Sequence, residues 1–196
     1  QEEAKASGST ESLAETIVRE NGKPIAEARG EVAYAAEFFR WFSEEAVRMH
    51  GSVVEAPAGG GKQMVLLQPV GVSYLITPWN FPAAMLTRKI GPALAAGCTV
   101  VAKPAAQTPL TAVAIEAILH RALAEAGVPE AVVNLVTSSD AKGVTAAVLG
   151  DPRVRKLSFT GSTEVGRLLL AQAAERVLNC SMELGGNAPF LVFADA

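Results

Sequence analysis

The sequence predicts an α/β fold: a five-stranded parallel sheet with helices on both faces. Beyond Pro69, short apolar runs alternate with longer segments of helical periodicity. The chain has 196 residues, of which 49% are apolar and 19% charged, enough for a well-buried core. This alternation is typical of βαβ units, whose strands run parallel. The expected strands are 70–76, 99–103, 132–136, 154–159 and 177–182, and the expected helices are 82–96, 109–126, 139–149 and 163–175.

Residues 1–50 are expected to form a helical segment that packs on the sheet domain. From Ile25 to Met49, apolar side chains recur at alternating spacings of three and four, which predicts one long amphipathic helix over 24–50. Alanine fills several of these positions, so packing on a domain is favoured over a coiled coil. Residues 1–12 are polar and have no signal-peptide pattern, and we expect them to be a loose lead-in.

Residues 51–68 predict a β-hairpin arm, because "SVVEA" and "QMVLLQP" flank the glycine-rich turn "PAGGGK". The sheet domain then spans 69–196. Its helix at 109–126 has the clearest ends. Thr108 is the expected N-cap, Pro109 occupies the first turn, and Gly127 follows the last one.

Composition excludes several function classes. The formal net charge is −3 and the isoelectric point is near 5.5, so neither nucleic acid nor an anionic membrane is an expected partner. The two cysteines, Cys98 and Cys180, stand outside any CxxC pair or metal-ligand cluster, which favours a reducing cytoplasm and no metal site.

Unusual residues follow the expected strands, at the edge where open α/β sheets bind ligands. Asn80, in "TPWNFP", offers a neutral amide that can donate to an oxyanion without titrating. Lys103 ends the second strand and is placed to reach a ribose hydroxyl or a phosphate. Each also has an ordinary alternative, a turn-forming amide and a solvated strand-end charge.

Three further side chains share that edge. Ser162, in "TGSTEVG", begins a helix whose free N–H groups could hold a diphosphate; an ordinary capped turn is the alternative. Glu183, in "SMELGGN", would act as a general base if partial burial raised its pKa; otherwise it is a paired carboxylate. Arg88 could clamp a substrate carboxylate, or be a plain surface arginine.

Together these stretches resemble the aldehyde dehydrogenase superfamily. The matching motifs are "PWNFP", "GCTVVAKPAAQTPLTA", "AGVPEAVVNLV", "KLSFTGSTEVGR" and "MELGGNAPFLVFADA", in family order, over roughly residues 13–196. Within the superfamily, "TRKIGPALAAGCTVV" and "GGNAPF" look most like succinate-semialdehyde dehydrogenases. The resemblance implies a Rossmann-like NAD(P)-binding domain over 69–196, with the hairpin at 51–68 as an oligomerisation arm.

The resemblance also implies roles for particular residues in oxidising an aldehyde, most like succinate semialdehyde, to its acid. Asn80 corresponds to the oxyanion-hole amide, Glu183 to the general base, and Arg88 to an arginine that grips a distal carboxylate. The implied cofactor-binding residues are Thr77, Pro78, Trp79, Lys103, Ala106, Gly161, Ser162, Leu184 and Gly185. The expected partners are a small aldehyde and, in the full-length parent, further copies of the same chain.

Two departures from the family pattern bear on function. Ala106 stands where NAD-preferring relatives often carry an acidic residue, so NADP is the expected cofactor and NAD is possible. The nucleophilic cysteine would lie beyond Ala196, since neither Cys98 nor Cys180 has the matching context. Two alternatives follow: a non-catalytic nucleotide-binding or assembly module, and a phosphorylating or CoA-acylating relative, which the deacylating Glu183 disfavours.

Overall fold

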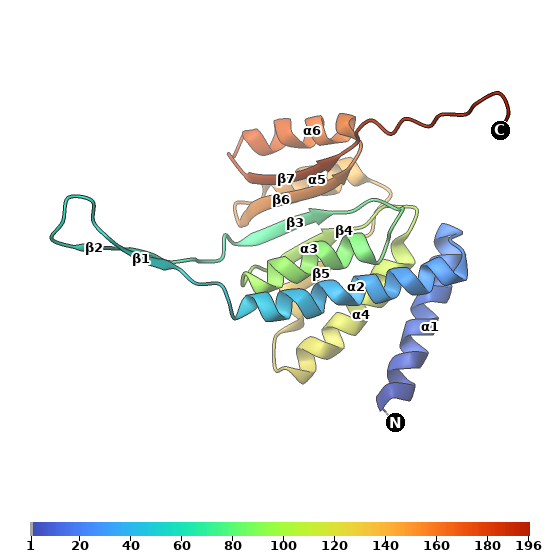
Figure 1. The fold of residues 1–196 in the computed structure, drawn as a ribbon, viewed down its shortest axis with the longest axis horizontal. Coiled ribbons are helices and arrows are strands. Elements are labelled where there is room, and N and C mark those ends of the chain that lie inside the picture. The colour runs from blue at the N-terminus through green and yellow to red at the C-terminus, as the bar shows by residue number, and fades with distance from the viewer. Residues whose placement is uncertain (1) are drawn as a thin grey trace.

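The computed structural model describes residues 2–196, and the side chains from residue 11 onward. At its centre is a sheet of five parallel strands in the order β5-β4-β3-β6-β7 (Figure 1). The strands are β3 (Val72–Ile76), β4 (Val100–Lys103), β5 (Val133–Leu135), β6 (Val154–Gly161) and β7 (Asn179–Leu184). The predicted fold class is confirmed, and β6 runs two residues further than expected.

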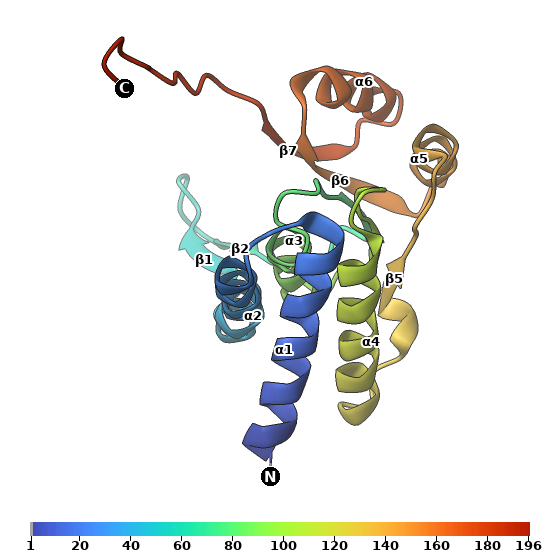
Figure 2. The ribbon, with the colours of Figure 1, turned by 90° about the vertical axis from the view of Figure 1, so that its right-hand side faces the viewer.

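Helices cover both faces of the sheet. They are α3 (Ala84–Ala95), α4 (Pro109–Glu125), α5 (Ala141–Gly150) and α6 (Thr163–Ala174), with a short 3₁₀ turn, η1, at Glu130–Val132. Neighbouring strand residues point to opposite faces, so Leu75 joins the core under α1 to α4 while Tyr74 joins the core under α5 and α6. Figure 2 shows these two groups of helices on either side of the sheet.

The N-terminal segment forms two helices, α1 (Glu2–Asn21) and α2 (Ile25–Ala46). The prediction of a loose lead-in over residues 1–12 is wrong, since residues 2–12 lie within α1. Ala14 and Ile17 are fully buried against the core, and this contact anchors a helix whose polar start gives no amphipathic pattern. The predicted long helix over 24–50 is present as α2 and ends at Ala46.

α1 also supplies a cap that the sequence did not suggest. Thr108 stands at the N-cap of α4 as predicted, but its hydroxyl makes no cap bond. The Glu20 carboxylate accepts instead, from the backbone N–H groups of Leu110 (2.7 Å) and Thr111 (2.9 Å). A carboxylate at a helix N-terminus satisfies orphan donors and complements the dipole, so α1 is tied to the loop after β4.

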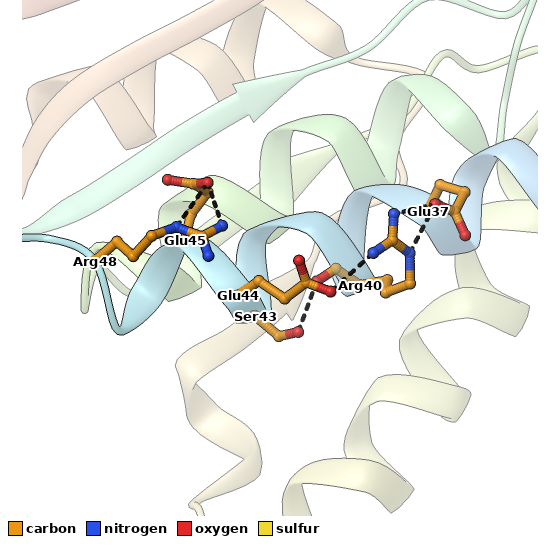
Figure 3. Close-up of polar contacts among 6 residues, drawn as sticks. All are labelled: Glu37, Arg40, Ser43, Glu44, Glu45 and Arg48. Carbon is orange, nitrogen blue, oxygen red and sulfur yellow. Dashed lines mark hydrogen bonds and ion pairs between the residues drawn. The ribbon is translucent and has the colours of Figure 1, made fainter.

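The outer face of α2 carries charged pairs one turn apart (Figure 3). Arg40 lies between Glu37 and Glu44, at 2.7 and 2.8 Å, and Arg48 pairs with Glu45 at 2.5 Å. Exposed pairs of this kind contribute little to stability, because water and salt screen their attraction. They therefore mark the solvent face of α2, while Ala28, Val32 and Ala35 of the same helix enter the core.

Two segments leave the body of the domain (Figure 1). The antiparallel hairpin of β1 (Ser52–Glu55) and β2 (Lys62–Val65) extends from the end of α2, as predicted, and all eight of its strand residues are exposed. The segment after β7 also extends outward, with Phe190 and Phe193 largely exposed. Among the described residues, no helix has the length and apolar character to cross a bilayer.

Candidate functional site

The strand order reverses between β3 and β6, and this is the place where open α/β sheets bind ligands. The carboxyl ends of β3, β6 and β7 meet there around a hollow of about 520 Å³. Its lining brings together the predicted residues Pro78, Trp79, Asn80, Arg88, Gly161, Ser162, Glu183, Leu184 and Gly185. Segments more than a hundred residues apart in the sequence thus share one cavity.

Glu183 lies on the wall of this hollow that β7 provides. It is paired with Thr160 in the parallel register of β6 and β7, so it stands level with the end of β6. The side chain is exposed in this chain. The sequence left partial burial as a condition for the general base, and that condition is not met in the described residues, because β7 is an edge strand of the sheet.

Arg88 comes from α3, the helix that follows the Asn80 loop, and its exposed side chain lies over the Phe38 ring at 5.5 Å. That distance is within the range of a cation–π contact, and the same arginine also lines the hollow. Its neighbour Lys89 is buried and donates to the Ser158 hydroxyl at 2.7 Å. Burial, reinforced by Arg88 and opposed by Glu183, lowers the pKa of Lys89 to about 8.

Ser162 and Gly161 join β6 to α6. The Ser162 hydroxyl accepts from the Val165 N–H at 3.3 Å, so the ordinary capped turn is present, with the first free N–H groups of α6 beside the hollow. Gly161 leaves no room for a side chain: a Cβ there would lie 2.5 Å from the Phe159 ring. A larger residue would push that ring or narrow the approach to the helix N-terminus.

Lys103 lies outside this hollow and lines a second one, of about 580 Å³, between α5 and α6. Its walls are largely apolar and include Ile76, Phe159, Val165 and Leu168. Ala106 lines a third hollow, of about 300 Å³, with Thr137, Ser138 and Ser139. Thr77 lines none of the three; it is buried, and its N–H donates to the Lys103 carbonyl at 3.2 Å, joining the loops after β3 and β4.

A sequence profile described as "Aldehyde dehydrogenase family" matches residues 5–196. The chain belongs to the aldehyde dehydrogenase family. It is 56% identical over 187 residues to the succinate-semialdehyde dehydrogenase of Paenarthrobacter nicotinovorans, an alignment that covers 95% of this chain and 41% of that protein. It is 54% identical over 184 residues to the NADP⁺-dependent succinate-semialdehyde dehydrogenase of Escherichia coli, covering 94% of this chain and 37% of the relative.

A solved structure agrees with these sequence relatives. The succinate-semialdehyde dehydrogenase from Burkholderia pseudomallei superposes with a TM-score of 0.87 at 51% identity, covering 94% of this chain and 37% of that one. The present chain thus spans about two fifths of the length of the relatives it matches. The family and the fold are therefore shown for this part of an aldehyde dehydrogenase.

The residues of this aldehyde dehydrogenase chain fit a dinucleotide. Lys103 is only 5% exposed, and its ammonium makes one long contact, to the Pro104 carbonyl at 3.4 Å. Burial lowers the pKa of Lys103, and among the described residues its other N–H donors have no acceptor. The Lys103 ammonium can therefore donate to a ribose hydroxyl or a phosphate of a bound dinucleotide. The apolar walls of the neighbouring slot suit the nucleotide base.

The apolar slot itself could not be predicted from the sequence. Val165 and Leu168 are exposed large hydrophobic residues one turn apart on α6, and with α5 they form its walls. An apolar pair at this spacing is ordinarily a buried helix face, so the sequence alone would assign it to the core. In the structure Val165 and Leu168 are exposed at the carboxyl edge of the sheet, and this exposure distinguishes a ligand slot from a buried helix face.

Neither cysteine lies in the hollow that holds Asn80 and Glu183. Cys98 is buried at the start of β4, and Cys180 is half-buried on β7. Burial raises the pKa of the Cys180 thiol, an effect that Lys156 partly opposes, so this thiol is less reactive than a free one. That neither cysteine acts as the nucleophile stays a prediction.

Proposed function

We propose that this chain is the cofactor-binding part of an NADP-dependent aldehyde dehydrogenase that oxidises succinate semialdehyde to succinate. One observation carries the proposal. Asn80, Arg88 and Glu183 come from three separate elements and line a single hollow beside the N-terminus of α6. Its similarity to two succinate-semialdehyde dehydrogenases supports the substrate, and one of those relatives is named for NADP⁺.

Each residue has a distinct part in this proposal. The Asn80 amide donates to the oxyanion that forms when a thiolate adds to the aldehyde. Arg88 binds the distal carboxylate and so orients the chain of the substrate. Bound NADP supplies the nicotinamide that accepts hydride, while Lys103 and the α6 N-terminus hold its ribose and diphosphate. Glu183 accepts a proton from the nucleophile or from the water that releases the acid.

The cofactor preference follows from Ala106. A carboxylate at this position would repel a 2′-phosphate, whereas alanine shares its hollow with the hydroxyl side chains of Thr137, Ser138 and Ser139. We expect the chain to bind NADPH more tightly than NADH in a fluorescence titration. The matched variant Ala106→Glu should reverse that order, and equal or tighter binding of NADH by the unaltered chain would contradict the preference.

The substrate assignment is tested at Arg88. In the full-length enzyme, Arg88→Ala should raise KM for succinate semialdehyde by about 10- to 100-fold, the loss expected for one charge-assisted pair. An uncharged aldehyde of the same length should be almost unaffected, since it has no carboxylate to lose. Equal increases in KM for both aldehydes would show that Arg88 does not bind the distal carboxylate.

A second candidate is a nucleotide-binding or assembly module without catalysis, and the absence of both cysteines from the hollow favours it for the 196 residues alone. The two candidates differ in whether a longer reading frame supplies a nucleophilic cysteine. In either case we propose that the protein is cytoplasmic, because its two cysteines are free. We also propose that the hairpin joins copies of the chain, because Val53 and Met64 are exposed apolar residues on it.

A further inference from the structure

The turn between α1 and α2 is hydrogen-bonded to the loop that carries Asn80. The Asn21 side-chain amide donates to the Trp79 carbonyl at 2.8 Å, and the Lys23 ammonium donates to the Asn80 carbonyl at 3.0 Å. Gly22, between them, has φ of +79°, a conformation that lets α1 end and the two donors face the same loop. Two successive carbonyls are thus held from one turn, 57 or 58 residues away in sequence.

Lys23 also belongs to a buried ion pair. Its side chain is 8% exposed and that of its partner Glu31, on α2, is 1% exposed. The second oxygen of Glu31 accepts from the backbone N–H groups of Ala83 at 2.8 Å and Ala84 at 3.2 Å, the start of α3. The α3 N-terminus has no cap from its own N-cap residue, so Glu31 takes that role.

The remaining contact of Lys23 is with the same loop, because its ammonium lies 3.8 Å from the centre of the Phe81 ring. A buried ion pair stabilises little by itself, because desolvating two charges costs about as much as their attraction returns. What such a pair does supply, when every donor and acceptor is satisfied, is a fixed geometry. Here the fixed segment runs from Trp79 to Ala84, and Asn80 is its second residue.

We propose that Lys23 is a positioning residue for Asn80, acting with Asn21 and Glu31 as a bracket that fixes the backbone from which the Asn80 amide is aimed into the hollow. Asn21, Lys23 and Glu31 do not line the hollow, so the bracket would not contact a bound substrate or cofactor there. The inference rests on the proposed function in one respect: Asn80 must be the oxyanion donor for its aim to affect the rate.

The test is a double-mutant cycle in the full-length enzyme. Lys23→Met keeps most of the aliphatic stem and removes the ammonium, and we expect kcat to fall roughly 10- to 100-fold, the range expected for a misplaced catalytic group. KM for NADP⁺ should rise by a much smaller factor than kcat falls, because Lys103 and its slot lie elsewhere and only Pro78 and Trp79 of the expected cofactor site belong to the loop that the bracket holds. In an Asn80→Ala background, the same Lys23→Met change should alter kcat by less than about threefold, since the group being positioned is gone.

A matched control comes from the same two helices. Arg29 of α2 makes a two-pronged pair with Glu11 of α1, at 2.7 and 2.9 Å, on an exposed surface away from the Asn80 loop. Arg29→Ala should leave kcat unchanged. The proposal is overturned if Arg29→Ala matches the effect of Lys23→Met, if Lys23→Met costs as much with Asn80 absent as with it present, or if KM for NADP⁺ rises by as large a factor as kcat falls.

A second variant covers the case in which Lys23→Met, with Glu31 left unpaired, does not fold. Asn21→Ala removes only the bond to the Trp79 carbonyl and leaves the buried pair intact. It should show the same dependence on Asn80 with a smaller loss of kcat. An unchanged kcat in Asn21→Ala would then reject the bracket.

A measurement on the 196-residue chain separates this inference from the proposed function. Trp41 and Trp79 are its two tryptophans, so Trp41→Phe makes Trp79 the sole reporter beside Asn80. Lys23→Met should lower the fluorescence anisotropy of Trp79 well below the melting temperature, and Arg29→Ala should not. If the full-length enzyme shows no aldehyde oxidation, the proposed function fails while this readout still decides whether the bracket holds the loop. Unaltered anisotropy in Lys23→Met rejects the bracket.

Discussion

Replacing Asn80 by alanine in the full-length enzyme is expected to lower kcat by about 10²- to 10³-fold, the usual cost of losing one oxyanion donor. The amide acts on charge that develops only in the transition state, so kcat and kcat/KM should fall together while the affinity for NADP⁺ stays the same. Steady-state kinetics with succinate semialdehyde, together with a cofactor titration, measure both quantities.

The substitution Asn80→Ala should change the chemistry without disturbing the fold. Asn80 is exposed, and its position depends on its own carbonyl, which Lys23 holds. Alanine keeps that carbonyl, so the melting temperature should hardly change, as for most surface substitutions. Asn80→Asp is the matched control: it keeps the shape but places a negative charge next to the oxyanion, and should be at least as slow as alanine. Full activity in either variant would exclude the amide from the oxyanion hole.

The sheet could be predicted from sequence because its strands are short apolar runs that end at unusual residues. The run at 154–159 is an example, since Val154, Leu157 and Phe159 are buried and Gly161 ends the strand. α1 could not be predicted over its first residues. Its helix is anchored by Ala14 and Ile17 against distant elements, and local polarity says nothing about such contacts.

Some residues of the site could likewise be predicted from the sequence, and others could not. Asn80, Glu183 and Ser162 could be picked out because each lies at or just beyond the carboxyl end of a strand, where position along the chain already implies proximity. The contacts of Lys23 and Glu31 carry no local pattern, since their partners in the loop lie 52 to 57 residues away. Lys89 carries no local pattern either, and only packing shows it to be buried.

Glu183→Gln is expected to lower the steady-state kcat of the full-length enzyme by about 10²- to 10⁴-fold, the contribution of a positioned general base. Glutamine preserves size and hydrogen bonding but cannot accept the proton. Stopped-flow measurement of NADPH then locates the step. A first-turnover burst that survives the substitution places the base at the release of the acid, because hydride transfer has already occurred. A lost burst places it at activation of the nucleophile.

Glu164→Gln is the matched control for this experiment. Glu164 lies in the first turn of α6, close in sequence to Ser162, for which we propose cofactor binding, yet it does not line the hollow. Its substitution removes the same charge from the same edge of the sheet and should leave both burst and steady state unchanged. If Glu183→Gln and Glu164→Gln behave alike, the effect is one of net charge near the site, and Glu183 is not the base.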